Sequence, residues 1–468
     1  MVRTRARMTP IEFGTDGWRG IIADDFTREN VGRVARAYAC VLHADGTACR
    51  GVVVGYDRRF LSDRMAAHAA DELSAAGVPA KLASCPVTTP AVSLHVVNGN
   101  HAGGLMVTAS HNPPEYNGIK IKSDVGGSAS EEYVARIAAS VDRPPGGPTP
   151  TVVERADIAA AYVERLLALH ADDRPSRRLR IVVDSMHGSG SGIGASVLRA
   201  MGHDVVGIRY SANPLFGGVF PEPIPPHIAA LQRAVGAEGA DLGVALDGDG
   251  DRIGAVTADG EFFSPHRILA LMALAALRSG ASGRIVKTVS TTGMLDRIGQ
   301  SFGAPVTTTP IGFKHVVHEI GKGGVLVGGE ESGGLWAPGY IPERDGIRIG
   351  VILANIVAGL GRPLHEEWDA VGREFGAWEY LRRDLAVPLE ARSRIEAAGK
   401  TIASVGGAPV ARADTTDGVK LVRDDGYWLM FRFSGTEPLL RLYAEAPTPA
   451  MCDDFLAEAE EIVVSARG

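Results

Sequence analysis

A single serine stands in a polar loop that directly follows a buried strand pattern. In GLMVTASHNPPEYNGIKIK, residues 104–122, the apolar run Leu-Met-Val ends in Thr-Ala-Ser-His-Asn and two prolines. The loop carries Ser110 and His111, and Lys120 follows in the next apolar run. Pro113 and Pro114 restrict the backbone, so we expect Ser110 to be held near one geometry instead of sampling many. A nucleophile on a stiff loop is the first candidate for chemistry.

Three aspartates alternate with glycines after a second buried run. In ALDGDGDRIG, Asp247, Asp249 and Asp251 follow the apolar LGVAL. If the loop is extended, the alternation points all three carboxylates to one side, and the glycines let the oxygens converge on a hard divalent cation. A calcium EF-hand is excluded, because Arg252 and Ala258 stand where that loop needs Gly and Glu. The pattern favours a Mg²⁺ site completed by a phosphate oxygen over a solvated turn.

Two more loops carry groups that suit a sugar phosphate, although the alternative is a plain surface turn for the first and a plain hairpin for the second. In VLVGGEESGGLW, Glu330, Glu331 and Ser332 lie between glycine pairs after a buried strand, where they can hydrogen-bond a hydroxyl-rich ligand. A guanidinium, two hydroxyls and a glycine stand together in FRFSGTEPLLRLY, at Arg432, Ser434, Gly435 and Thr436. That composition suits a phosphate dianion.

A glycine-rich turn in the middle of the chain has the spacing of a dinucleotide-binding site. GSGIGA at residues 190–195 follows a strand pattern with G-x-G-x-x-A spacing. The next apolar run, DVVGIRYS, has its acid Asp204 at the start and none at its end, where a ribose-binding carboxylate belongs. A nicotinamide or flavin site is therefore not expected.

The elements that must position these loops follow from the hydrophobic pattern. Apolar runs from Gly51, Leu179 and Gly283 each lead through a loop into an Ala/Leu-rich amphipathic stretch. Because the runs do not alternate, they predict strand–helix units in largely parallel sheets, and hence three related α/β domains. From about Trp378 the strand patterns and two helical stretches predict a C-terminal α+β domain with an antiparallel sheet.

Length and linker composition set the expected domain borders. At 468 residues the chain is too long for one hydrophobic core. The stretch 141–154 is rich in proline and glycine, and GAVTADGEFFSPH predicts a hairpin around Asp259 and Gly260 before a new helix. The expected domains are 1–150, 151–258, 259–375 and 376–468.

Composition and charge limit the class of protein. Hydrophobic residues at 45% and charged residues at 22% are ordinary for a globular chain. The net charge is −7 and no dense Lys/Arg cluster occurs, which argues against a nucleic-acid partner. Four cysteines without CxxC spacing argue against a disulfide framework and a zinc site, and no apolar run is long enough to span a bilayer. We expect a cytoplasmic protein without a membrane partner.

Five motifs together resemble the α-D-phosphohexomutase superfamily, the phosphoglucomutase and phosphomannomutase enzymes, over essentially the whole chain. They are FGTDGWRG from Phe13, TASHNPPEYNGIK from Thr108, DGDGDR from Asp247, GEESGG from Gly329 and RFSGTEP from Arg432. The resemblance implies an α/β fold in which three related α/β domains and a C-terminal α+β domain surround a central cleft. Each domain would lend one loop to that cleft.

The resemblance also implies a reaction. Ser110 is expected to carry a phosphoryl group that it lends to the sugar and recovers from it, with one Mg²⁺ per chain bridging that phosphate to Asp247, Asp249 and Asp251. A hexose 1-phosphate and a hexose 6-phosphate, of glucose or mannose, would interconvert through a 1,6-bisphosphate that turns around between two transfers. Glucose 1,6-bisphosphate is the expected activator, and the protein is expected to be a monomer or homodimer.

The same resemblance assigns the remaining site residues. Those expected around the phosphoserine and the transferring phosphate are Arg19, His111, Lys120 and Arg252. Those expected on the sugar and its distal phosphate are Gly312 and Lys314 of TPIGFK, Glu330, Ser332, Arg432, Ser434, Gly435 and Thr436.

Three positions depart from the family pattern. Gly334 stands where many members have a histidine, and Phe433 stands where the phosphate loop usually has proline. Arg344 in IPERDG stands at the basic position of an REKDG-like stretch. Because arginine stays charged and is a poor proton acceptor, Arg344 is expected to stabilise charge. The identity of the general acid or base stays open.

Alternatives also remain open. A phosphoglucosamine or phosphopentose mutase is the alternative. A phosphohydrolase that passes the phosphate from Ser110 to water is less expected, because a separate phosphate loop and a sugar loop argue against it. A protein that only binds sugar phosphates is disfavoured, because binding alone needs no nucleophile.

Overall fold

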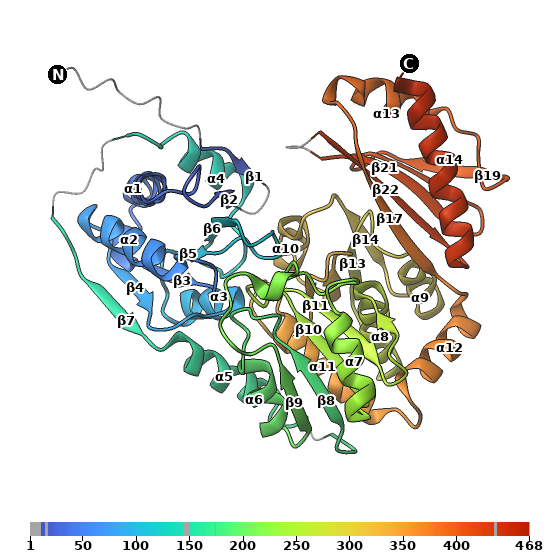
Figure 1. Cartoon of the computed structure of the whole chain (residues 1–468), viewed down its shortest axis with the longest axis horizontal. Helices are drawn as coiled ribbons and strands as arrows, with labels where there is room; N and C mark the ends of the chain where they lie inside the picture. The colour runs from blue at the N-terminus through green and yellow to red at the C-terminus, as the bar shows by residue number, and fades with distance from the viewer. Residues whose placement is uncertain (1–10, 15–16, 144–148, 174, 435–437, 468) are drawn as a thin grey trace. The chain divides into compact units, whose positions relative to one another are not determined.

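The computed structural model describes residues 11–14, 17–143, 149–173, 175–434 and 438–467 (Figure 1). It divides into two compact units, Met1–Pro265 with Gly333–Pro363 and His266–Ser332 with Leu364–Gly468. The segment Gly333–Pro363 falls inside the expected third domain but groups with the first unit. The four domain ranges stay a prediction, and the two units are described separately.

A seven-stranded mixed sheet, in the order β1-β2-β6-β5-β3-β4-β7, carries the serine loop in the first unit. Its strands are β1 (Phe13–Gly14), β2 (Gly17–Ile21), β3 (Val52–Tyr56), β4 (Ala80–Ala83), β5 (Gly103–Val107), β6 (Tyr116–Lys122) and β7 (Val153–Ala156). Its helices are α1 (Arg28–Ala44), α2 (Ser62–Ala75), α3 (Thr89–Asn98) and α4 (Glu131–Ala138), with a 3-10 turn at Ala48–Arg50. Strand β7 lies just past the expected border at residue 150 and pairs in parallel with β4.

A five-stranded sheet, in the order β12-β11-β10-β8-β9, carries the aspartate loop in the same unit. Its strands are β8 (Arg180–Asp184), β9 (Asp204–Ile208), β10 (Leu242–Leu246), β11 (Ile253–Thr257) and β12 (Phe262–Phe263). The unit also contains α5 (Ile158–Leu169), α6 (Ile193–Ala200), α7 (Ala229–Glu238), α11 (Gly346–Gly359), β16 (Leu335–Trp336) and a 3-10 turn at Phe216–Gly218. The hairpin expected around Asp259 and Gly260 is confirmed, because β12 pairs antiparallel with β11.

Both sheets of the first unit are mixed, whereas the sequence predicted largely parallel ones. Strands β3, β4, β5 and β7 run parallel, but β5 pairs antiparallel with β6. In the same way β8, β9 and β10 run parallel while β10 pairs antiparallel with β11. The reason is that the serine loop and the aspartate loop each reverse the chain and return it as the adjacent strand, without a crossover helix. Both loops therefore leave the carboxyl end of a buried strand.

The second unit begins with a parallel sheet in which β13 lies between β14 and β15. Its strands are β13 (Arg284–Thr288), β14 (Val306–Thr309) and β15 (Val325–Gly329), and its helices are α8 (Pro265–Arg278), α9 (Met294–Phe302), α10 (Phe313–Gly321) and α12 (Leu364–Phe375). The strand–helix units expected from residues 51, 179 and 283 are thus confirmed.

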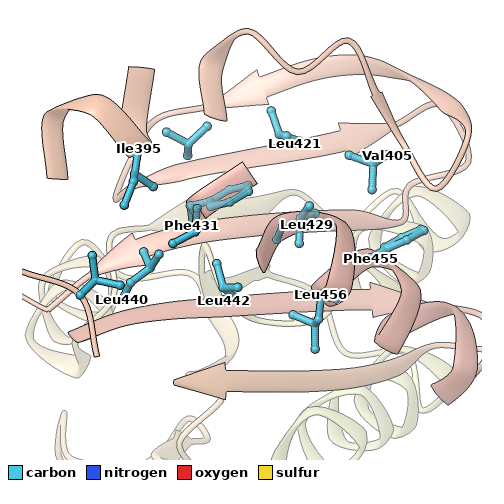
Figure 2. Close-up of a cluster of buried hydrophobic side chains, with 14 of the residues drawn as sticks. Ile395, Val405, Leu421, Leu429, Phe431, Leu440, Leu442, Phe455 and Leu456 are labelled. Carbon is cyan, nitrogen blue, oxygen red and sulfur yellow. The ribbon is translucent and has the colours of Figure 1, made fainter. Parts of the chain in front are cut away.

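The rest of the second unit is an antiparallel sheet in the order β17-β22-β21-β20-β19-β18. Its strands are β17 (Glu379–Ala386), β18 (Ser404–Val405), β19 (Ala408–Asp414), β20 (Val419–Arg423), β21 (Trp428–Phe433) and β22 (Leu439–Ala446), with a 3-10 turn at Leu389–Ala391. Helices α13 (Arg392–Lys400) and α14 (Pro449–Arg467) complete it. Figure 2 shows its core, where Leu429, Phe431 and Leu442 of the strands meet Ile395 and Phe455 of the helices. The predicted C-terminal α+β domain is confirmed.

Two sequence-based expectations concern the environment of the protein. Among the described residues no single helix is long and apolar enough to cross a membrane. The four cysteines, Cys40, Cys49, Cys85 and Cys452, are free.

Candidate functional site

Ser110 lies at the end of β5 in an unusual backbone conformation. Its φ of 53° is in the left-handed region, which residues with a Cβ rarely occupy. The Ser110 N–H donates to Thr108 Oγ1 at 2.9 Å, and the hydroxyl donates to Asp247 Oδ2 at 2.7 Å. The side chain is fully buried in this structure. The nucleophile predicted from sequence is therefore hydrogen-bonded directly to the aspartate loop.

The three aspartates converge through a turn, and the extended loop assumed from their alternation is wrong. The Gly250 N–H donates to the Asp247 carbonyl, and Gly250 has a φ of 72°, which reverses the chain between the carboxylates. One oxygen from each of Asp247, Asp249 and Asp251 lies within 4.8 Å of the others, and all three residues are fully buried. A side chain at Gly248 would stand 2.4 Å from the Ser110 carbonyl, so the glycine allows the two loops to touch.

Two cations from distant parts of the chain lie against this triad. Lys120 Nζ on β6 is 2.7 Å from Asp249 Oδ2 and 2.6 Å from Asp251 Oδ2. Arg344 Nε donates to the same Asp251 oxygen at 2.8 Å. Both cations are almost completely buried. The charge of Arg344 therefore offsets that of a carboxylate of the triad, and its role in the reaction stays a prediction.

Three further residues expected near the phosphate lie close to the serine loop or to the triad. His111 Nδ1 lies 3.4 Å from Ser110 Oγ, and Arg19 donates to Asn112 Oδ1 on the same loop. Arg252 Nε is 4.0 Å from Asp247 Oδ2. Burial and the neighbouring cations, Arg252 foremost, hold the pKa of His111 well below its usual value, so its imidazole is neutral.

The residues of the triad fit a divalent cation. Burial raises the pKa of Asp247 well above its usual value, and the charges of Asp249 and Asp251 raise it further. Among the described residues, nothing hydrogen-bonds the buried Asp249 Oδ1. Closely spaced carboxylate oxygens, at least one of them without a hydrogen bond among the described residues, are the hard donors that Mg²⁺ prefers. A phosphate on Ser110 would lie beside them.

The second unit contains the residues expected to bind the sugar and its distal phosphate. Gly312 has a φ of 123° and precedes α10, which carries Lys314 in its first turn. Asp417 accepts from the Ile311 N–H at 3.0 Å and from Arg432 Nε at 3.1 Å, so it joins Arg432 to the loop of Gly312 and Lys314. Within this unit the structure therefore brings two of the expected substrate loops together.

The remaining expected residues of this unit lie at strand ends. Glu330 is buried and directly follows β15, and the Ser332 hydroxyl is buried and, among the described residues, has no hydrogen-bond partner. Ser434 is buried at the end of β21, and its N–H donates to the Leu439 carbonyl at 2.8 Å. Gly435 and Thr436 lie outside the described residues.

Two residues that sequence reasoning did not select contact this site. Thr89, the first residue of α3, donates through its hydroxyl and its N–H to Asp249. Arg59, in the loop after β3, donates to backbone carbonyls of the serine loop. Thr89 stands 160 residues before its partner, and a Thr-Thr-Pro stretch indicates only the start of a helix. The sequence therefore gives no local signal for either contact.

Comparison with known families gives a consistent result over the whole chain. Four models of phosphoglucomutase/phosphomannomutase match in order: domain I at residues 10–145, domain II at 160–260, domain III at 264–375 and the C-terminal domain at 387–462. The glycine-rich turn at residues 190–195 lies within the second of these.

Individual relatives agree with these models. A phosphoglucomutase/phosphomannomutase of Thermococcus kodakarensis is 31% identical over 453 residues, covering 95% of this chain and 96% of its own. A phosphoglucosamine mutase of Salinispora tropica is 32% identical over 470 residues, covering 97% and 98%. A solved structure of a Thermus thermophilus protein assigned as a phosphomannomutase is 38% identical, with a TM-score of 0.87 and coverage of 98% and 100%.

Proposed function

The chain belongs to the phosphoglucomutase/phosphomannomutase family and is an intramolecular phosphotransferase, and from this premise we propose that it interconverts the 1- and 6-phosphates of glucose or mannose through phospho-Ser110. The observation that carries the proposal is the 2.7 Å hydrogen bond between Ser110 Oγ and Asp247 Oδ2. This contact supports Ser110 as the nucleophile, because its partner carboxylate belongs to the group that would hold the metal.

In the first transfer the bond between phosphorus and Ser110 Oγ breaks, and a bond between phosphorus and a sugar hydroxyl oxygen forms. The sugar hydroxyl gives up its proton, and we assign the uptake of that proton to the neutral His111, which lies 3.4 Å from Ser110 Oγ. In the second transfer the opposite phosphate of the 1,6-bisphosphate returns to Ser110, and the proton returns to the sugar oxygen. Phosphate and proton are conserved over the full cycle.

Asp247, Asp249 and Asp251 would hold the Mg²⁺ on which the family depends, and that ion neutralises charge on the transferring group when it is bound. Lys120 and Arg344 lie on the same carboxylates and would offset the charge of the phosphoserine. Because Arg344 keeps its proton, we assign it to charge stabilisation and not to proton transfer.

Residues of the second unit would hold the sugar. Glu330 and Ser332 are assigned to its hydroxyls, and Lys314 and Arg432 to its oxygens and distal phosphate. The open hydrogen-bonding capacity of the Ser332 hydroxyl supports this assignment. Glucosamine 1-phosphate is the second candidate substrate, because a phosphoglucosamine mutase is among the relatives of similar identity.

A substrate panel tests the proposal. The 1-phosphates of glucose, mannose, glucosamine and ribose are incubated with the enzyme, Mg²⁺ and trace glucose 1,6-bisphosphate, and the products are read by phosphorus NMR. We expect the 6-phosphate of glucose or mannose, with one phosphate on Ser110 by mass spectrometry. Isomerisation of glucosamine 1-phosphate alone would move the enzyme to the second candidate, and release of inorganic phosphate without an isomer would contradict a mutase.

A further inference from the structure

The buried guanidinium of Arg59 binds several backbone carbonyls of the serine loop. Arg59 Nη2 donates to the carbonyl oxygens of Ser110 at 2.8 Å and Asn112 at 2.6 Å. Its Nη1 donates to the carbonyl oxygens of Pro113 at 2.8 Å and Tyr116 at 3.0 Å. A guanidinium has four Nη hydrogens in a fixed plane, so these contacts use all of them. The four Nη hydrogens therefore match the four carbonyl oxygens of the loop in number and in direction.

Arg59 is itself fixed on every side. Its backbone N–H donates to Asp57 Oδ1 at 2.9 Å, and its Nε lies 3.4 Å from Asp57 Oδ2. The guanidinium stands over the ring of Phe216, 4.9 Å from the centroid. The side chain is completely buried, which lowers the pKa of Arg59, whereas the charge of Asp57 raises it. A group held this firmly can impose its geometry on a loop.

The loop needs such a constraint at Ser110. The residue has a φ of 53°, a region that is unfavourable for side chains with a Cβ. Arg59 holds the Ser110 carbonyl, and Thr108 Oγ1, which donates to Asp57 at 2.6 Å, accepts from the Ser110 N–H. Arg59 thus binds the Ser110 carbonyl directly, and the Thr108 hydroxyl links the Ser110 N–H to Asp57. The Ser110 hydroxyl is left facing Asp247.

We propose that Arg59 is the positioning residue of the nucleophile, whose four hydrogen bonds to the loop hold Ser110 in the conformation that presents its oxygen to the aspartate triad. The proposal rests on the assignment of Ser110 as the phosphoryl carrier. Lysine cannot replace Arg59, because an ammonium has three hydrogens in a tetrahedral arrangement and reaches fewer of the four carbonyls. Phosphoryl transfer depends on alignment of oxygen and phosphorus, so a loosened loop lowers the rate of transfer more than it weakens substrate binding.

Arg59→Lys is the main variant and Arg33→Met is its matched control. Arg33 is also a buried arginine of this unit, but it pairs with Asp142 and Asn30. We expect Arg59→Lys to lower kcat by about 10–100-fold with KM changed less than about threefold, and Arg59→Met to lower it further. Arg33→Met is expected to lower the melting temperature and to leave kcat within about twofold.

Hydrogen exchange supplies a readout that needs no sugar. In Arg59→Lys, the amides of residues 110–112, 115 and 116 are expected to exchange at least about tenfold faster than in wild type, with protection of α1 and β3 unchanged. If kcat stays within twofold of wild type, or the loop exchanges at the wild-type rate, the positioning role is refuted. Wild-type enzyme that isomerises no sugar phosphate would refute the proposed function instead, and the exchange data would still decide the role of Arg59.

Discussion

Each unit of the protein buries a cluster of oppositely charged side chains, and the two clusters differ in the hydrogen-bond partners of those side chains. In the first unit Asp247, Asp249 and Asp251 meet Lys120 and Arg344. The carboxylates crowd one another, burial and like charge raise the pKa of Asp247, and Asp249 Oδ1 lacks a hydrogen bond among the described residues. This cluster has capacity left for a ligand.

In the second unit three charged side chains each bind a backbone group. Lys287 Nζ donates to the Thr292 carbonyl and Lys420 Nζ to the Val289 carbonyl, at 2.8 and 2.7 Å. Glu445 Oε2 accepts from the Gly293 N–H at 2.7 Å and from the indole of Trp428 at 2.6 Å. These contacts fix the segment between β13 and α9 to the C-terminal sheet. The cluster joins two parts of one unit.

Burial and charge alone therefore do not distinguish a reactive site from a structural junction. Both clusters contain lysines paired with carboxylates, and both perturb pKa values through burial. The distinction lies in the hydrogen-bond partners of the charged groups. In a structural junction these groups bind the backbone, whereas in a reactive site some of their oxygens stay available for a ligand. Substitutions in one cluster should consequently change chemistry, and those in the other should change stability.

Removal of the proposed nucleophile gives the largest expected effect. In Ser110→Ala we expect turnover to fall by at least about 10³-fold, because no oxygen remains to carry the phosphoryl group. The thermal midpoint should stay near that of wild type. Turnover is followed by phosphorus NMR and phosphate incorporation by intact mass, with the exposed Ser301→Ala as control. A phosphorylated, active Ser110→Ala enzyme would place the nucleophile elsewhere.

Neutralising one member of the triad should separate chemistry from stability. Asp249→Asn removes a buried carboxylate from a group of three, and we expect turnover to fall about 100-fold and Mn²⁺ affinity, measured by electron paramagnetic resonance, to fall at least tenfold. Loss of like-charge repulsion should leave the unfolding midpoint unchanged or higher. Asp71→Asn on the exposed face of α2 is the control. Unchanged Mn²⁺ affinity would show that the triad is not the metal site.

The corresponding change in the second cluster should lower stability and leave turnover nearly unchanged. Glu445→Gln keeps an acceptor for Gly293 and Trp428 but removes the charge that faces Lys420 and Lys287. We expect the free energy of unfolding, from urea titration, to fall by about 2–3 kcal/mol, because buried cations lose their counter-charge. Turnover of the folded enzyme should stay within about twofold. The exposed Glu390→Gln should change neither quantity, and loss of turnover in Glu445→Gln without loss of stability would end the distinction between the clusters.

The sequence predicted those features that depend on neighbouring residues. A buried run followed by polar residues and a helical pattern identified β3, β8 and β13 with their helices, and glycines between aspartates predicted that the carboxylates would converge. Local pattern suffices for these because the hydrophobic period and the turn chemistry act within about ten residues.

Contacts between distant residues could not be predicted in this way. Arg59 stands 51 residues before Ser110, and Lys122 lies 221 residues before Glu343, with which it forms a buried ion pair at 2.6 Å. The segment Gly333–Pro363, which carries Glu343, joins the first unit although it follows β15 of the second. Its sequence does not indicate which sheet it packs against. Such pairings follow from the tertiary fold.

His266 offers the finest test of the second cluster, through acid stability. Its Nδ1 accepts from the Thr292 N–H at 3.1 Å, and burial, with Lys287 and Lys420, lowers its pKa from 6.5 to about 3. The unfolded chain therefore binds a proton that the folded chain refuses, so stability is lost as pH falls below 6.5, by about 1–2 kcal/mol at pH 5. His266→Asn keeps an acceptor for Thr292 without a titrating group. In urea titrations, its free energy of unfolding should therefore fall by about 1–2 kcal/mol less than that of wild type between pH 7 and pH 5. The exposed His318→Asn should retain the wild-type slope. Equal slopes for wild type and His266→Asn would mean that the folded protein binds this proton as readily as the unfolded chain, which would contradict the lowered pKa of His266.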